Sequence, residues 1–391
     1  MSKATIGRKS VGWIGLQRGQ RIRVGEWIVE KGIFAISFSA ILMVLLIFVF
    51  VGREALPIFL GKMNTSLAGK TIPPGEMENL PAQELQTYLD LSPEQFRSMD
   101  RETLKALMEL KVEAAKEVSK DKDAAVNTTS WRYLLFPYQW SDYTKPSYIW
   151  QPVSSIPKYN IVPLMLGSIK ATVVALLFSV PLALAAAIFV SQLATPGVRE
   201  IVKPGIELLA AIPSVVLGFF ALIIMATVLQ TIFGYASRLN AFVAGIALGL
   251  AVIPVVFSVA EDALTSVPRS YTQAALALGS SKWQAAWQIV FPAALPGVFA
   301  AVVLGFGRAI GETMVVLMAS GNASIVSWSL FDSTRTITAT IAAEVLEAPV
   351  HAHHYRMLFM IGTLLFVVTF VSNLVGELVI NRLKNRLEGK A

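Results

Sequence analysis

Arg308 and Glu312 are the charged residues of this sequence best placed to do chemistry, because they lie inside a long apolar stretch. They stand four residues apart within residues 292–319 and are the only charged residues there. Residues at this spacing lie on nearly one face of a helix, where opposite charges can pair. An arginine at the centre of a membrane costs about 2.5–3.5 kcal/mol on insertion scales, and it is tolerated where it faces water or pairs with another charge. Two interpretations follow: a structural ion pair between helices, or a cation that meets an anionic substrate, with Glu312 as its resting partner.

The neighbouring residues extend this candidate path. Gly307 and Gly311 are four residues apart, a spacing of small residues that lets helices approach closely. Thr313 directly follows Glu312, and we include it in the predicted path. Glu207 lies in another apolar stretch, where it either reaches water from near the end of its helix or lines an inner gate.

No nucleotide-binding loop accompanies these residues. The glycines around Arg308 are wrongly spaced for a dinucleotide fingerprint, and they lie in an apolar stretch instead of following a strand. Gly69-Lys70-Thr71 resembles the end of a phosphate-binding loop, but that loop needs a glycine where this sequence has Asn64. We therefore predict that the chain is not an enzyme, has no catalytic residue and binds no cofactor or metal itself.

A second pattern lies in residues 261–291, a less apolar interruption between two apolar spans. Residues 267–278 favour a helix that stops at Gly279, and Ser280 and Ser281 can begin a second helix. The expected structure is a helix–turn–helix at the membrane surface, whose short apolar face can seat in a groove on a soluble partner. A simple amphipathic linker is the alternative.

The composition indicates the elements that position these residues. The chain is 54% hydrophobic and 15% charged, with a mean hydropathy of +0.60, whereas soluble proteins are normally about 25% charged. A bilayer core of roughly 30 Å needs about 20 apolar residues in a helix. We predict an all-α polytopic membrane protein with six transmembrane helices, at residues 32–52, 163–190, 204–233, 239–260, 292–319 and 357–380.

The positions of Lys and Arg predict the orientation. The chain carries a net charge of +7, and both its N-terminal segment and its C-terminal tail are basic. Cytoplasmic segments of membrane proteins collect such residues, and six spans place both termini on one side, so we expect both to be cytoplasmic. The plan is a cytoplasmic segment 1–31, a first helix 32–52, an extracytoplasmic insert 53–162, a five-helix core 163–380 that includes the cytoplasmic loop 261–291, and a cytoplasmic tail 381–391.

The insert has its own expected features. Residues 76–123 predict two or three short helices, with helix starts at Ser92 and Asp100. Residues 119–130 are polar, and we expect them to be mobile. The dense aromatic residues of 131–150 suit anchoring at the membrane interface, packing on neighbouring external loops, or a small folded cap.

A second external loop, residues 320–356, contains a segment, 337–345, that favours a short helix. His351, His353 and His354 lie together further along this loop without acidic or cysteine companions. We interpret them as ordinary polar loop residues.

Two sets of residues resemble known ABC importer permeases. Members of this family press a loop with a Glu-Ala-Ala pattern against their ATPase, and the matching residues here are Gln273, Ala274, Ala275, Gly279, Ile289 and Pro292. Gln273 replaces the family's Glu, which removes a charge but leaves the turn intact. Residues 307–314, Gly-Arg-Ala-Ile-Gly-Glu-Thr-Met, and residues 207–216 are similar to phosphate importer permeases of the PstC type. The resemblance runs through most of residues 160–385.

This resemblance implies a type I importer permease fold in the inner membrane of a bacterium. It implies a heterodimer with a sister permease, PstA, two copies of an ATPase, PstB, that uses ATP and Mg, and an external phosphate-binding protein, PstS. It also implies that Arg308 and Glu312 are the pair associated with phosphate passage.

Two other functions stay open from the residues themselves. The chain could carry another oxyanion, such as sulfate or molybdate. From a different class, it could be a membrane scaffold or sensor that transports nothing.

Overall fold

The structure of the protein, a computed structural model, describes residues 24–63, 65, 85, 89, 91, 93–118, 121–350 and 352–387. The chain divides into two compact units, Met1–Phe50 and Val51–Ala391. Six helical segments of the described residues are long and apolar enough to cross a membrane: Val29–Phe59, Val162–Leu193, Ser214–Phe233, Ala241–Thr265, Lys282–Gly311 and His353–Asn385. The prediction of an all-α protein with six spans is confirmed.

The first predicted span, 32–52, falls inside helix α1 (Val24–Phe59). The large apolar side chains along residues 33–50 are exposed on several faces of this helix. A helix that is apolar all round needs an apolar environment, which a bilayer supplies. The helix is followed by a turn in which Gly61 adopts φ +64°, a left-handed conformation that favours glycine.

The third span begins later than predicted. Ile212 and Pro213 have non-helical backbones, and they separate α8 (Pro196–Leu208) and the 3₁₀ turn η3 (Leu209–Ala211) from α9 (Ser214–Phe220). The span continues through the π-turn η4 (Ala221–Met225) to α10 (Ala226–Phe233). The predicted span 204–233 is therefore wrong at its start, because proline cannot continue the preceding helix. Glu207 consequently lies in α8, outside the third candidate span.

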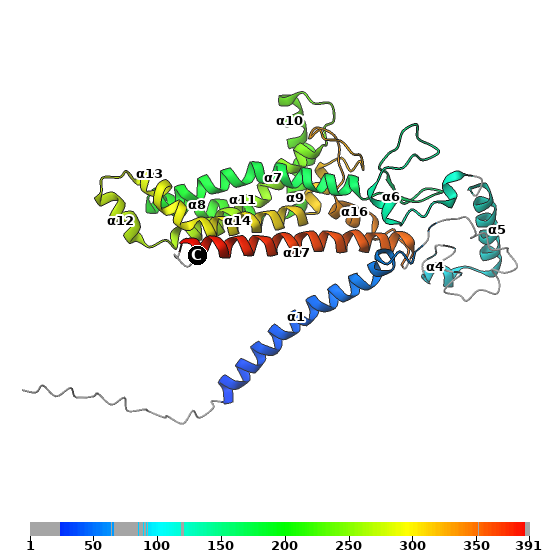
Figure 1. Ribbon diagram of the computed structural model, residues 1–391, viewed down its shortest axis with the longest axis horizontal. Coiled ribbons are helices and arrows are strands. Elements are labelled where there is room, and N and C mark those ends of the chain that lie inside the picture. The colour runs from blue at the N-terminus through cyan, green and yellow to red at the C-terminus, as the bar shows by residue number, and fades with distance from the viewer. Residues whose placement is uncertain are drawn as a thin grey trace, which may run out of the picture. The chain divides into compact units, whose positions relative to one another are not determined.

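Four long helices pack side by side in the second unit: α7 (Val162–Ile188), α11 (Ala241–Thr265), α14 (Phe291–Gly311) and α17 (His353–Leu387) (Figure 1). Helix α11 is central, and its Leu248, Val256 and Phe257 are fully buried. Gly245 lets α11 approach α7 closely, since an added Cβ would lie 2.5 Å from Val174. Small residues at such contacts are the usual means by which membrane helices pack.

The two ends of this helix bundle carry different connections. Helices α12 (Arg269–Ala277) and α13 (Lys282–Ala285) lie at one end, and α6 (Trp131–Leu135) and α16 (Ile337–Glu344) lie at the other (Figure 1). The predicted helix at 337–345 is confirmed as α16. The loop 261–291 and the insert are therefore at opposite ends of the bundle, as six spans require.

The insert is folded where the structure describes it. Helix α4 (Pro93–Ser98) and helix α5 (Arg101–Val118) are present, and the Asp100 carboxylate accepts a hydrogen bond from the Thr103 amide at 3.3 Å, as its predicted capping role requires. Ser92 lies outside the described residues. Strands β1 (Trp150–Gln151) and β2 (Lys158–Tyr159) pair antiparallel, and Trp150 lies opposite Tyr159.

The expectation that residues 119–130 are mobile is wrong for residues 121–130, while 119 and 120 lie outside the described residues. A 3₁₀ turn, η1 (Lys122–Ala125), is capped by Asp121, and Thr128 is buried. The Thr128 amide donates to Thr65 Oγ1 at 2.7 Å, and Asn127 Nδ2 donates to the Met63 carbonyl at 3.0 Å. These hydrogen bonds join Met63 and Thr65, which follow α1, to residues 127–128, a contact that the sequence pattern alone did not show.

Some of the aromatic residues of 131–150 pack inside a small folded cap, whereas Trp131, Phe136 and Tyr143 are exposed. Trp140 and Trp150 are buried, and Tyr138 packs edge-on against both Tyr133 and Trp140. Two of the three expectations for this segment match the packing: the folded cap, and packing on a neighbouring external loop, since Trp150 Nε1 donates to Glu344 at 3.1 Å. His351 lies outside the described residues, whereas His354 Nε2 lies 3.3 Å from a Glu344 oxygen. The expectation that this histidine cluster lacks an acidic companion is therefore wrong.

A buried carboxylate joins two segments at the loop end of the bundle. Glu261, near the end of α11, is 1% exposed and lies 2.5 Å from an Arg199 nitrogen and 2.7 Å from Lys203 Nζ, both on α8. The hydrogen bond that Lys203 donates to Glu261 raises the pKa of the Lys203 ammonium. A buried charge is costly unless it is paired, so this carboxylate fixes α8 against α11.

We expect the substitution Glu261→Gln to lower the free energy of unfolding by about 1–3 kcal/mol, because a neutral amide leaves two cations without their counter-charge. Thermal unfolding of the purified protein in detergent measures this loss. Asp262→Asn is the matched control, since Asp262 is 77% exposed and 3.8 Å from Lys203. An equal loss in both variants would contradict a specific role for Glu261.

Candidate functional site

The fifth span is broken at the predicted path. Helix α14 ends at Gly311, Glu312 has an extended backbone (φ −71°, ψ 135°), and α15 (Met314–Ala319) begins after Thr313. The predicted continuous span 292–319 is therefore wrong: the candidate span is Lys282–Gly311, and a break separates it from α15. Breaks of this kind leave backbone groups without helical partners, and they are tolerated at membrane depth only inside protein or beside water.

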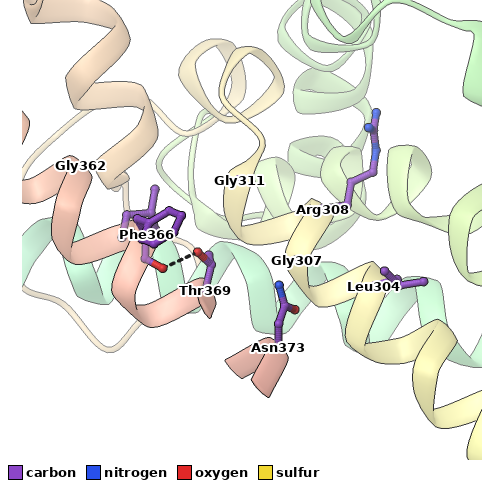
Figure 2. A pocket seen from close by; sticks show the side chains of 9 residues that line it. Leu304, Gly307, Arg308, Gly311, Gly362, Phe366, Thr369 and Asn373 are labelled. Atoms are coloured by element: carbon purple, nitrogen blue, oxygen red, sulfur yellow. Dashed lines mark hydrogen bonds between the residues drawn. The ribbon is translucent and has the colours of Figure 1, made fainter. Parts of the chain in front are cut away.

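The break also changes the expected relation between Arg308 and Glu312. Neither residue forms an ion pair with any residue that the structure describes, so the predicted resting pair is wrong. The absence of this ion pair has a local cause: a spacing of four residues aligns two side chains only while the helix continues through both. Arg308 is exposed, Glu312 and Thr313 are partly exposed, and the Arg308 side chain points away from α17 (Figure 2).

Packing places Arg308 at the middle of the bundle. An added Cβ on Gly305, one turn before Arg308, would lie 2.5 Å from Val256 and 3.2 Å from Val252. Both valines are close to the centre of the 25-residue helix α11. The guanidinium is therefore carried at about the depth where a charge costs most in lipid.

An open pocket of about 560 Å³ lies between α14 and α17 at this level. It is lined by Leu304, Gly307, Arg308, Gly311, Gly362, Leu365, Phe366, Thr369 and Asn373 (Figure 2). Asn373 faces α14, and an added Cβ on Gly307 would lie 3.8 Å from its Oδ1. Sequence reasoning missed Asn373, although a lone amide inside the apolar run 357–380 was a usable signal.

A second residue missed from the sequence is Thr338, on α16. Its Oγ1 donates a hydrogen bond to the backbone carbonyl of Glu312 at 3.0 Å. This bond satisfies one of the carbonyls that the helix break exposes. Its signal is absent from the sequence, because residues 312 and 338 meet only through the tertiary fold.

Glu207 is not part of this arrangement. It is exposed on α8, one turn after Lys203. Among the described residues it makes no hydrogen bond or ion pair with the residues of the break. The structure thus brings Arg308, Glu312 and Thr313 together, with Asn373 and Thr338 beside them, and leaves Glu207 elsewhere.

The loop 261–291 begins with the predicted helix and turn. After α12, Gly279 adopts φ +90°. The Gly279 amide donates to the Leu276 carbonyl at 3.0 Å and the Ser280 amide to the Ala275 carbonyl at 3.1 Å. This pair of bonds is a Schellman motif, which requires a left-handed residue and so favours glycine. Ser281 then starts α13 with a capping box formed with Gln284.

The second helix of the loop is not separate from the fifth span. Helix α13 passes through the π-turn η5 (Ala286–Val290) into α14, so that Lys282–Gly311 forms one continuous helix. Pro292 lies inside this continuous helix, two residues after the π-turn, and does not interrupt it in the structure. The expectation of two surface helices is therefore corrected to one short helix, α12, and the end of a long one.

The predicted partner-docking residues surround an exposed apolar surface. Gln273, Ala274 and Gly279 are exposed, Ala275 is buried, and Ile289 and Pro292 are partly buried. Four large side chains near them are at least half exposed: Tyr271, Leu278, Trp283 and Trp287. The rings of Trp283 and Trp287 stack with their centroids 6.1 Å apart.

Comparison with known proteins identifies the class of this chain. Residues 179–387 match the family described as "Binding-protein-dependent transport system inner membrane component". The chain belongs to this family. It is a multi-pass membrane subunit of an ABC importer, and membership implies an ATPase and a substrate-binding protein as partners.

Several curated relatives resemble the chain. The "Probable ABC transporter permease protein YqgH" of Bacillus subtilis is 33% identical over 222 residues, which cover 57% of this chain and 72% of that protein. The phosphate transport system permease protein PstC of Xylella fastidiosa (strain 9a5c) is 34% identical over 260 residues, 61% of this chain and 78% of that protein. PstC of Pasteurella multocida is 32% identical over 260 residues, which cover 62% of this chain and 80% of that protein.

Solved structures of two importers are more distantly similar. A chain of the inward-facing MetNI methionine ABC transporter is 17% identical with a TM-score of 0.47, covering 57% of this chain and 95% of that chain. A chain of a bacterial alginate ABC transporter is 16% identical with a TM-score of 0.42, and the match covers 58% of this chain and 78% of that chain.

We expect Gly305→Ala to lower the free energy of unfolding by about 1–3 kcal/mol, because the new methyl group would force α14 away from α11. Denaturant or thermal unfolding in detergent measures the change. Gly311→Ala is the control, since no atom lies within 4 Å of its added Cβ. If the two variants unfold alike, the close contact between α14 and α11 is not what positions Arg308.

Proposed function

We propose that the chain is the permease subunit of a phosphate importer and that Arg308 contacts the anion as it crosses the membrane. The observation that carries this proposal is a single exposed guanidinium, without an ionic partner among the described residues, at the middle depth of the bundle. Glu312 and Thr313 form the adjoining break in the helix. Glu207 retains at most a role at the inner end of the path, because it lies on α8.

The exposed side of α14 supports a path between two subunits. Leu304, Arg308 and Gly311 are exposed along this helix, and Met314 continues the exposed stripe after the break. A guanidinium turned toward lipid at this depth would cost about 2.5–3.5 kcal/mol or more. A second permease that covers the stripe and encloses water would remove most of this cost. The sister permease, similar to PstA, is the partner that we assign to it.

The chemistry of arginine suits a phosphate ion. The guanidinium is planar and always charged, and it can donate two parallel hydrogen bonds to two oxygens of one anion. A transport contact must also be weak enough to release its cargo. Water in the path and the carboxylate of Glu312 nearby would both weaken the attraction of Arg308 for the anion.

Phosphate is favoured over sulfate or molybdate by resemblance. The PstC relatives are described as phosphate permeases, and residues 307–314 match the pattern of that type. The guanidinium alone does not separate these anions, because all of them present oxygens in tetrahedral geometry. Competition for uptake by each anion in vesicles distinguishes them. Co-purification with an ATPase separates a permease from a scaffold or sensor.

The two ends of the bundle suit two partners. The exposed apolar residues around Gly279 form a surface for a partner's groove, and we assign this groove to an ATPase dimer similar to PstB, which binds the ATP and Mg. The insert at the other end then faces the phosphate-binding protein, similar to PstS. Both basic termini lie on the ATPase side, in the cytoplasm of a bacterium.

In this mechanism, closure of the ATPases upon ATP moves α12 and the continuous helix that begins at Lys282. The helix carries the movement to Arg308 and the break. The path changes from inward-open to outward-open, and the external protein releases phosphate into it.

Arg308→Gln should reduce phosphate uptake in vesicles by more than about tenfold, because the neutral amide cannot offset the charge of the anion in an apolar path. Uptake of labelled phosphate by the reconstituted complex measures this loss, and co-purification shows that the complex still assembles. Arg238→Gln is the control, since Arg238 is exposed on the loop that precedes α11. Normal uptake by the Arg308→Gln complex would refute the proposed path.

Gly279→Val should reduce ATP hydrolysis that depends on transport by about threefold or more. A β-branched residue at φ +90° is strained by roughly 1–2 kcal/mol, and this strain would open the turn between α12 and α13. Stimulated ATPase activity of the complex is the measurement. Gly205→Ala serves as control, because Gly205 has open space around it and no left-handed backbone. Unchanged stimulation in Gly279→Val would count against docking at this loop.

A further inference from the structure

Helix α16 is held rigidly among the long helices. Thr336 caps its first turn by accepting a hydrogen bond from the Ala339 amide at 3.2 Å. The Ile337 amide donates to Ser168 Oγ on α7 at 3.0 Å. Ala339 and Thr340 are fully buried. A short helix fixed at this many points moves with its neighbours as one piece.

One end of α16 contacts the broken fifth span. Thr338 Oγ1 donates to the Glu312 carbonyl at 3.0 Å. This carbonyl lies where α14 has ended and α15 has not begun, so the helices do not fix its direction. The hydroxyl of Thr338 therefore contributes to the backbone conformation between Gly311 and Thr313.

The other end of α16 contacts the insert. Glu344, the last residue of the helix, accepts a hydrogen bond from Trp150 Nε1 at 3.1 Å, and Arg335 Nη1 lies 2.8 Å from its other oxygen. Trp150 is buried on β1 and packs edge-on against Tyr159 of β2, so it moves with the sheet of the insert. Burial raises the pKa of the Glu344 carboxyl, and the charge of Arg335 and the Trp150 bond oppose that rise. The Trp150 bond is thus one of the interactions that keep the buried carboxylate in place.

We propose that α16 is a strut that couples the insert to the helix break, with Trp150 and Thr338 as its two positioning residues. A displacement of the insert, such as a protein bound to it would cause, moves Glu344. Helix α16 transmits this movement to Thr338, six residues earlier on the same helix, and through its hydroxyl to the Glu312 carbonyl. The proposal rests on the proposed function in one respect, since it takes the residues beside Glu312 as the transport path.

A probe at the break tests the coupling without any substrate. The chain contains no cysteine, so Met314→Cys provides a single site for a nitroxide spin label at the start of α15, where Met314 is 39% exposed. The label is read by electron paramagnetic resonance in the full chain, in membranes. Trp150→Phe keeps an aromatic ring and removes the Nε1 donor, and Thr338→Val keeps the shape and removes the hydroxyl. Both should change the mobility of the label.

Two matched controls separate coupling from general damage. Trp140→Phe changes a buried tryptophan of the insert in a different cluster of side chains. Thr340→Val removes a hydroxyl that bonds to the carbonyl of Thr336, the residue that caps α16, at 2.8 Å. Neither should alter the spectrum of the label at position 314.

The same variants predict a transport phenotype in the assembled complex. Loss of one hydrogen bond corresponds to a decrease in uptake of about threefold to tenfold for Trp150→Phe and for Thr338→Val. Because both bonds belong to one strut, the double variant should lose no more uptake than the more impaired of the two single variants. If Trp150→Phe does not accumulate in the membrane, Glu344→Gln with Glu347→Gln as control provides the same comparison.

An unchanged label spectrum in Trp150→Phe, or strictly additive losses in the double variant, would overturn the strut. The label decides this even if Arg308→Gln transports phosphate normally, so a failure of the proposed function and a failure of the coupling give different results.

Discussion

The structure depends on one requirement, that every backbone group inside the bundle must find a hydrogen-bond partner. A continuous helix meets this requirement by itself, but the fifth span stops at Gly311 and resumes at Met314. The exposed carbonyl of Glu312 is satisfied by Thr338, a residue from a helix that does not cross the bundle. The break therefore requires α16, and α16 in turn requires the contacts that hold it to α7, α17 and the insert. Water or protein must surround such a site, because lipid cannot bond its backbone.

Much of the fold could be predicted because lipid imposes simple rules on composition. Runs of about 20 apolar residues gave all six spans, and glycine and serine at 279–281 gave the turn of the loop correctly. Errors occurred where tertiary contacts override local pattern. The start of the third span depends on the non-helical backbone before Ser214, and the break at Glu312 follows no proline. Residues 121–130 looked mobile because their polar partners, such as Thr65, are distant in sequence.

The candidate site was predicted in part for the same reason. Arg308 could be identified from the sequence alone, since a charge inside an apolar run is costly in a membrane and indicates a functional or paired residue. The surroundings of Arg308 could not be predicted, because Thr338 reaches Glu312, and Asn373 reaches Gly307, only through the tertiary fold. The expected pairing with Glu312 assumed an unbroken helix. Family membership supports a transport role for the chain.

The merger of α13, η5 and α14 into one rod has a mechanical consequence. Thirty residues, Lys282–Gly311, span about 45 Å at 1.5 Å per residue. A stiff rod that pivots near its centre turns a tilt of about 10° into opposite displacements of roughly 4 Å at its tips. Pressure at the tryptophan-bearing tip would thus be carried toward the guanidinium end along one continuous helix, which includes the π-turn η5 and Pro296. The length of this helix therefore sets how far its tips move for a given tilt. An insertion of one residue in the helix would rotate the distant tip by about 100°.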